Sequence, residues 1–177
     1  MRPSHAIVDL AALRRNLARA AACAPGANNV AVIKANGYGH GLVPVARALE
    51  DVAEALAVAT IDEALVLRDA GIAAPLLVLQ GATTRDDVAE AAERRLWLML
   101  HSVAQVEALC RSRAERPVTA WLKIDTGMGR LGVPFAEATK FLELIESLKG
   151  IRVEGLLSHF ASADEQDKSF SNQQLER

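Results

Sequence analysis

Short apolar runs alternate with segments of helical pattern along this 177-residue chain. Near-continuous apolar runs of this length are typical of strands that a parallel sheet buries on both faces. The pattern predicts six such strands, at residues 29–35, 55–59, 75–80, 96–101, 119–125 and 153–160. A shorter run at 6–10 precedes them, and the pattern gives it no clear partner in the sheet.

The segments between these runs carry helix start and stop signals. Residue pairs with the spacing of a capping box, in which each residue bonds the other's backbone, precede several of them. These pairs are Thr60 with Glu63, Thr84 with Asp87, and Ser102 with Gln105. Pro134 suits the first turn of a helix at 135–150, and Gly150 suits its end. Further helices are expected at 10–24 and from about residue 169 onward.

Alternating strands and helices with short connections predict parallel strands joined by right-handed crossovers. About six βα units are present. A closed (β/α)8 barrel needs eight units and about 250 residues, whereas an open doubly wound sheet can stop at six. No GxGxxG motif follows a strand, so nothing local supports a dinucleotide fold. The pattern predicts an α/β protein and leaves these two shapes open.

Composition and charge narrow the class of protein. With 51% hydrophobic residues, a formal net charge of -2 and no long block of one sign, the chain is expected to be globular, without a nucleic-acid or membrane-surface partner. No apolar run reaches the roughly 18 residues that span a bilayer. The first ten residues lack the apolar stretch of a secretory signal. Cys23 and Cys110 are interpreted as packed residues of a reducing, cytoplasmic protein.

The stretch AVIKANGYGHG, residues 31–41, places a charge where a buried strand should continue. Lys34 ends the first predicted strand, on the face where parallel α/β folds bind ligands. A lysine amine that has lost its proton is a nucleophile and condenses with aldehydes. The following glycines permit a tight bend and leave room for a bulky ligand, with Tyr38 and His40 beside it. A strand-end lysine above an ordinary glycine turn explains this stretch alone equally well.

A second unusual stretch is WLKIDTGMGRLG, residues 121–132. Lys123 and Asp125 interrupt a buried strand, where charges must be paired with each other or with neighbours. The glycine-rich turn then presents Arg130, whose guanidinium can donate two hydrogen bonds to a planar carboxylate. The alternative is a structural network of ion pairs.

The third candidate is His159, which follows the sixth predicted strand in SHFASADE. A lone histidine here can also be a satisfied core residue. However, Lys34, Arg130 and His159 follow the first, fifth and sixth strands, and parallel strands put those ends on one face. We therefore expect one site. His101 shares the strand-end position but has no evident partner, and we assign it to packing or capping.

Together, AVIKANGYGHG, LKIDTGMGRLG and SHFASADE resemble alanine racemase, a fold-type III pyridoxal 5'-phosphate (PLP) enzyme. The resemblance covers essentially the whole chain in order and spacing. It implies a parallel (β/α)8 TIM-type barrel, followed in the family by a β-rich domain, with a homodimer as the working form. It also implies the PLP-dependent interconversion of L-alanine and D-alanine for peptidoglycan precursors, with a small-molecule substrate and no metal.

The resemblance assigns roles to individual residues. Lys34 matches the lysine that holds PLP covalently and then moves the proton on the D-alanine face of Cα. Tyr38 matches a tyrosine that contacts the cofactor phosphate, and His159 matches a histidine beneath the cofactor ring. Arg130 matches the arginine beside the substrate carboxylate. Lys123 matches a lysine that is carbamylated in some members, where the carbamate would give Arg130 an anionic partner.

The family's remaining strands, main phosphate loop, second catalytic base and β domain would all follow Arg177. We therefore expect residues 1–177 to form a truncated barrel domain with unpaired edges on its first and sixth strands, and to racemise poorly alone. Two alternatives stay open: a non-catalytic PLP-binding single-domain protein, and an amino-acid racemase of broader substrate range.

Overall fold

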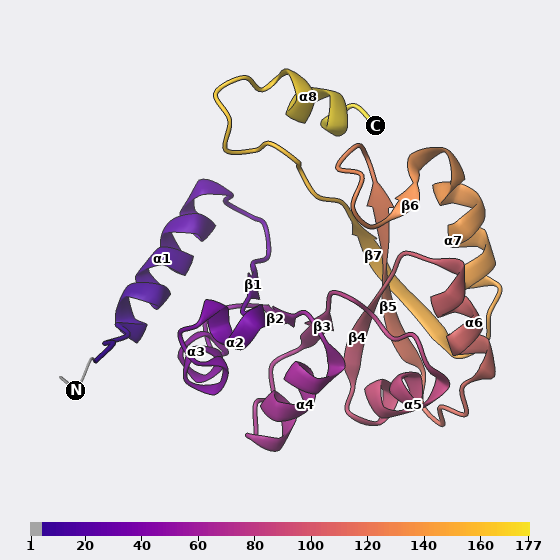
Figure 1. Ribbon diagram of the computed structural model, residues 1–177, viewed down its shortest axis with the longest axis horizontal. Coiled ribbons are helices and arrows are strands. Elements are labelled where there is room, and N and C mark those ends of the chain that lie inside the picture. The colour runs from indigo at the N-terminus through magenta and orange to yellow at the C-terminus, as the bar shows by residue number, and fades with distance from the viewer. Residues whose placement is uncertain (1–4) are drawn as a thin grey trace. The chain divides into compact units, whose positions relative to one another are not determined.

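The computed structural model describes residues 5–177. The chain folds as two compact units, Met1–Leu79 and Gln80–Arg177 (Figure 1). Residues 1–4, which belong to the segment interpreted above as lacking a secretory signal, lie outside the described residues. Within the described part, no helix is both long and apolar enough to cross a membrane.

The N-terminal unit is built around the parallel strands β1, β2 and β3. Its elements are α1 (Leu10–Cys23), β1 (Val30–Val32), α2 (Lys34–Tyr38), α3 (Leu42–Leu49), β2 (Ala55–Val58), α4 (Ile61–Asp69) and β3 (Leu76–Val78). In the sheet, Val30 lies opposite Ala55 and Leu56 lies opposite Leu76. The first three predicted strands and their parallel arrangement are confirmed, but β1 and β3 each span only three residues of the longer runs predicted at 29–35 and 75–80.

The C-terminal unit is organised around β5, which pairs in parallel with β4, β6 and β7. Its elements are α5 (Arg85–Glu93), β4 (Leu96–Leu100), α6 (Val103–Arg111), β5 (Val118–Asp125), β6 (Val133–Pro134), the 3-10 helix η1 (Phe135–Glu137), α7 (Ala138–Glu146), β7 (Ile151–Leu157) and α8 (Ser169–Leu175). The last three predicted strands are confirmed as β4, β5 and β7. The short β6 was not predicted.

The strands differ in how far they are buried. Every residue of β2 and β3 is buried, as expected for strands covered on both faces. In β1, however, Val30 and Val32 are 41% and 42% exposed, and Leu156 of β7 is 55% exposed. The prediction that all six strands are covered on both faces is therefore wrong for β1 and β7. Apolar character alone does not report whether a second layer covers a strand.

The capping predictions are confirmed in part. Thr84 and Asp87 form a complete capping box at the start of α5, with bonds of 3.1 and 3.3 Å. At α4, Thr60 Oγ1 accepts the backbone N–H of Glu63 at 3.3 Å. The Glu63 carboxylate does not return this bond and reaches other backbone groups instead, as described below.

At α6 the expected capping box is wrong, because Gln105 turns into the core and Ser102 makes no capping bond. The Gln105 Oε1 accepts the backbone N–H of His101 at 2.8 Å, and its Nε2 donates to the Gln80 carbonyl at 2.8 Å. The half-buried His101 thus lies beside a buried amide. This agrees with its assignment to packing or capping.

The helix predicted at 135–150 begins later than expected. Pro134 lies in β6 rather than in a first helical turn, and η1 separates it from α7, which ends at Glu146. Gly150 follows with φ of 80°, a conformation that glycine adopts readily. Pro134 is compatible with β6 because β6 lies at the end of the strand order, and an edge strand tolerates a missing N–H.

The two cysteines are on helices, Cys23 at the end of α1 and Cys110 in α6, but both are free and exposed. The interpretation that they pack in the core is wrong. In α6 the buried face is formed by Gln105, Val106, Ala108 and Leu109, and Cys110 lies outside it.

The run at 6–10 forms no strand: residues 6–9 have no regular secondary structure, and Leu10 is the first residue of α1. Asp9 caps this helix through a 2.9 Å bond from the Ala12 N–H to its carboxylate. Within α1, Arg14 forms an ion pair with Asp51 and fixes the helix to the segment after α3.

Candidate functional site

The first candidate motif forms a left-handed turn directly after β1. Ala35, Asn36, Gly37 and Tyr38 have φ angles of 53°, 56°, 64° and 52°. For residues other than glycine, this conformation costs roughly 1–2 kcal/mol each. Such strain persists only where the surroundings hold the backbone in place, and it clusters at functional sites. The α2 segment that carries Lys34 is therefore a strained turn and not an ordinary helix.

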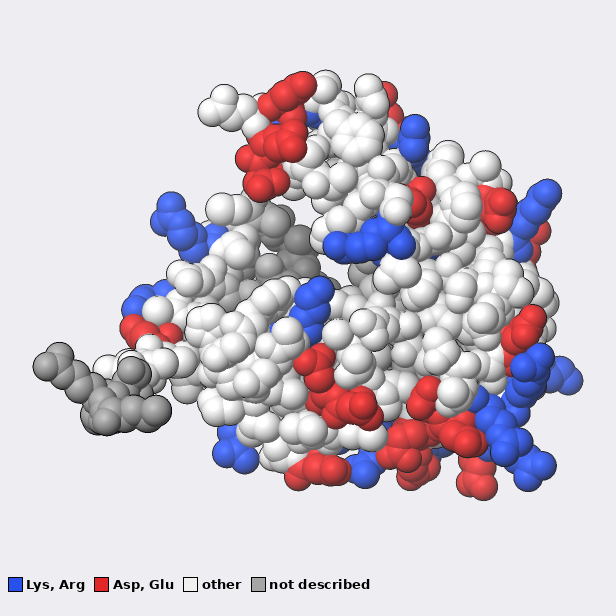
Figure 2. All heavy atoms as spheres, in the orientation of Figure 1, with Lys and Arg blue, Asp and Glu red and all other residues white. Residues whose placement is uncertain are grey.

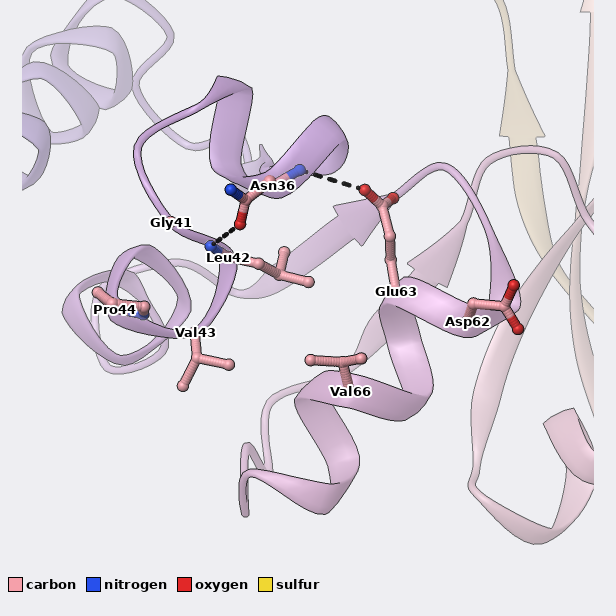
Figure 3. Close-up of a pocket in the computed structure, with 8 residues that line it drawn as sticks. All are labelled: Asn36, Gly41, Leu42, Val43, Pro44, Asp62, Glu63 and Val66. Atoms are coloured by element: carbon pink, nitrogen blue, oxygen red, sulfur yellow. Dashed lines mark hydrogen bonds between the residues drawn. The ribbon is translucent and has the colours of Figure 1, made fainter.

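Several hydrogen bonds hold this turn (Figure 3). The Asn36 side-chain oxygen accepts the Leu42 N–H at 2.9 Å, and the Asn36 N–H donates to Glu63 Oε1 at 3.3 Å. The second oxygen of Glu63 accepts the Ala59 N–H at 2.8 Å. Beside these groups lies a pocket of about 470 Å³, lined on the α4 side by Glu63 and Val66.

The polar side chains of this turn differ in their surroundings. Lys34 is half-buried and Tyr38 is 58% exposed. Within residues 5–177, neither side chain has a hydrogen bond or an ion pair, so both keep their bonding capacity for a ligand. His40 instead binds back to the turn, with Nδ1 2.9 Å from the Gly37 carbonyl oxygen. The structure thus gives His40 a role in the turn itself.

The second motif forms the end of β5 and the turn that follows. The Asp125 carboxylate accepts the N–H of Gly127 at 2.9 Å and that of Gly129 at 3.0 and 3.1 Å. These backbone bonds hold the pKa of Asp125 below its usual value. Asp125 is thus satisfied by the turn rather than by an ion pair with Lys123, one of the pairings that the sequence left open.

Lys123 is a buried cation, with 7% of its surface exposed. Burial lowers its pKa, the nearby charge of Arg130 lowers it further, and Asp125 partly opposes both effects. Arg130 itself is exposed in the glycine turn. Among the described residues its guanidinium makes no hydrogen bond or ion pair. The turn after β5 therefore presents the positive charge of Arg130, which suits an anionic ligand.

The third motif follows β7. His159 is exposed, so it is not the satisfied core histidine that the sequence also allowed. Its backbone carbonyl accepts Gln174 Nε2 at 3.0 Å, and the same Nε2 donates to Thr126 Oγ1 at 3.2 Å. Gln174 Oε1 accepts the Ala161 N–H at 2.9 Å. A buried amide on α8 therefore joins the segment after β7 to the turn after β5.

The structure groups the predicted site residues by unit. Lys34 and Tyr38 lie together on one turn of the N-terminal unit. Lys123, Arg130 and His159 belong to the C-terminal unit. Sequence reasoning missed the two side chains that hold these segments, Glu63 and Gln174. Glu63 was assigned to a capping box, and Gln174 lies in a polar stretch with no distinguishing pattern.

Parallel strands with helical connections and candidate polar residues beyond the strand ends define an α/β protein with its candidate site at the carboxyl ends of the strands. The family model "Alanine racemase, N-terminal domain" matches residues 8–177. The chain belongs to the alanine racemase family, which confirms the family predicted from the three motifs.

Individual relatives agree. The chain is 47% identical to alanine racemase of Pseudomonas entomophila over 99% of its length and 49% of the relative's. It is 41% identical to the biosynthetic alanine racemase of Escherichia coli O6:H1, with the same coverage. The crystal structure of biosynthetic alanine racemase from Pseudomonas aeruginosa superposes with a TM-score of 0.89 at 40% identity, covering 96% of this chain and 47% of that one.

The chain thus spans about half the length of the curated relatives it matches. The likeness to solved racemases and the parallel strands of each unit confirm the predicted fold class, an incomplete (β/α)8 barrel. Of the two shapes that the pattern left open, the barrel is the one supported.

Proposed function

We propose that this chain forms the PLP-binding barrel domain of an alanine racemase that interconverts L-alanine and D-alanine. The observation that carries the proposal is the Lys34 amine, held on a strained turn after β1 without a protein partner among the described residues. Family membership supports the same reaction. The proposal includes a cytoplasmic homodimer that supplies D-alanine for peptidoglycan.

The residues of the N-terminal unit fit a cofactor with an aldehyde and a phosphate. The Lys34 amine would link covalently to the aldehyde, and the Tyr38 hydroxyl would donate a hydrogen bond to the phosphate. PLP, when bound, spreads the negative charge that develops at Cα as its proton leaves. Lys34 Nζ, set free when the substrate amine takes its place on the aldehyde carbon, would accept or return that proton on the D-alanine face.

The residues of the C-terminal unit fit the substrate carboxylate and the cofactor ring. Arg130 would bind the carboxylate through its guanidinium fork, and His159 would contact the ring. Because burial lowers the pKa of Lys123, its neutral amine is easier to reach than that of an ordinary lysine, and this is the form that combines with carbon dioxide to give a carbamate and a released proton. We include this modification in the proposal, because the carbamate would neutralise the positive charge shared with Arg130.

A labelling experiment tests the cofactor site. The purified 177-residue chain is mixed with PLP, reduced with borohydride and mapped by peptide mass spectrometry. The adduct should be on Lys34 and should disappear in Lys34→Ala. Lys140→Ala, which removes an exposed lysine of α7, is the matched control and should keep the label. A label spread over surface lysines would contradict the proposed site.

A second assay tests the substrate. Exchange of the Cα hydrogen in D₂O is followed for D-alanine, D-serine and D-lysine, because exchange on this face needs only the Lys34 amine, whereas racemisation also needs a second base. The proposal expects alanine to react fastest. Equal rates with all three would indicate a racemase of broader range. A Lys34 adduct without exchange at any Cα would indicate a non-catalytic PLP-binding protein.

A further inference from the structure

Glu63 joins two backbone segments of the N-terminal unit that are far apart in sequence. Its Oε1 accepts the N–H of Asn36 at 3.3 Å, in the turn after β1, and its Oε2 accepts the N–H of Ala59 at 2.8 Å, directly after β2. Figure 3 shows the Glu63 side chain extending from α4 toward Asn36. A capping-box glutamate would bond the N–H of Thr60, so this side chain is diverted from its local role.

The turn after β1 needs such an anchor. Ala35, Asn36 and Tyr38 all have positive φ without being glycine, so the free backbone would leave this conformation. Asn36 is held on two sides, because Glu63 receives its N–H while its own side-chain oxygen receives the N–H of Leu42. The turn is therefore fixed to α4 on one side and to α3 on the other.

The chemistry of a carboxylate matters at this position. Both partners of Glu63 are donors, and a carboxylate offers an acceptor on each oxygen. Within the described residues Glu63 has no ion pair, so its charge is directed at these backbone N–H groups. A glutamine of the same size would keep one acceptor and turn an NH₂ group toward the other N–H, where two donors oppose each other.

We propose that Glu63 is a positioning residue that holds the strained turn after β1 and thereby orients Lys34 and Tyr38 toward their ligand. The role in orienting Lys34 rests on the proposed function. The hold on the turn does not, because it concerns backbone groups that can be measured without cofactor.

The test compares Glu63→Gln and Glu63→Asp with the matched control Asp62→Asn, which removes an exposed carboxylate from the same helical turn. Glu63→Asp keeps the charge but is too short to bridge both N–H groups. The first measurement is amide hydrogen exchange of the chain without PLP. At Asn36 and Ala59, both Glu63 variants should exchange about tenfold faster than wild type, and Asp62→Asn should match wild type.

The second measurement is the share of the borohydride-trapped PLP adduct found on Lys34. This share should fall severalfold in both Glu63 variants, while the melting temperature of the chain changes little. It should be unaffected in Asp62→Asn. Wild-type exchange rates in Glu63→Gln would overturn the proposal. So would faster exchange with an undiminished Lys34 share. If the PLP adduct of the wild-type chain is not on Lys34, the proposed function is wrong. The hydrogen-exchange rates would still show whether Glu63 holds the turn.

Discussion

The Asp125 carboxylate accepts the backbone N–H of Gly129 through both of its oxygens, at 3.1 and 3.0 Å. A further bond from the Gly127 N–H closes the turn that leads to Arg130. Because the negative charge is met by backbone donors, Asp125 shapes the turn without cancelling the charge of Arg130. Asp125 thus positions the Arg130 guanidinium by holding the backbone of the turn, without an ion pair between the two side chains.

The first prediction concerns Asp125→Asn and pH. The folded-state pKa of Asp125 lies below the ordinary 3.8. Its stabilising contribution is therefore complete above pH 3.8 and is lost as the pH falls through the folded-state pKa. Asp125→Asn should cost about 1 kcal/mol at pH 7, a low value because the turn is open to solvent. Urea unfolding at several pH values should show the two proteins converging in acid; a constant difference would contradict this.

Lys123→Met should stabilise the chain, because it removes a buried cation that is repelled by the charge of Arg130. We expect a gain of about 1–3 kcal/mol at pH 7 in buffer free of carbon dioxide. The folded-state pKa of Lys123 is below 10.5, so between these values the unfolded chain binds more protons. Wild-type stability attributable to Lys123 should therefore rise with pH across that window. Chemical unfolding should show this rise in wild type and not in Lys123→Met. A less stable variant in that buffer would count against the prediction.

Gly132→Ala should be strongly destabilising. Gly132 has φ of 137°, and an added Cβ would lie 2.6 Å from the Asp125 backbone nitrogen. Steric crowding and the backbone conformation together should cost about 3 kcal/mol. Gly129→Ala is the control, since its φ is 71° but nothing lies within 4 Å of the added atom. It should cost only about 1 kcal/mol. Equal losses on thermal unfolding would show that the close approach does not matter.

The main strands could be predicted because a strand that is buried on both faces needs a continuous run of apolar residues, and such runs are visible in the sequence. Residues such as Leu56 and Leu76 are wholly buried, and their neighbours on both sides are apolar as well. β6 could not be predicted, because two residues that pair with the end of β5 form no apolar run. The exposed faces of β1 and β7 were missed for a related reason: what covers a strand depends on tertiary structure.

The sequence predicted the reactive side chains of the candidate site, but not the residues that hold the backbone around them. Glycines around Lys34 indicated a tight bend, yet the positive φ of Ala35 and Tyr38 has no local signature. Likewise the sequence leaves open where a polar side chain such as Glu63 or Gln174 finds its partner. Apart from Ala59, which is four residues from Glu63, these partners lie 13 to 48 residues away in the chain and become neighbours only once the strands have paired.

The last prediction concerns Gln174, a residue that is 4% exposed. Gln174→Leu keeps an apolar side chain of similar size but leaves the Ala161 N–H and the His159 carbonyl without their bonds. Because these two bonds are only partly buried, losing them should cost about 1–2 kcal/mol. Because the same amide reaches Thr126, the segments after β5 and β7 should loosen together.

Hydrogen exchange of the chain should therefore show faster exchange at Ala161 and through the turn after β5 in Gln174→Leu, with β4 unaffected. The control is Gln173→Leu, a neighbouring exposed position in α8, which should change stability by no more than about 0.5 kcal/mol. Loosening confined to α8 would refute the link, because a helix that merely frays leaves the turn before Arg130 intact. Loosening of both segments would mean that one buried amide couples the backbone beside Arg130 to the backbone beside His159.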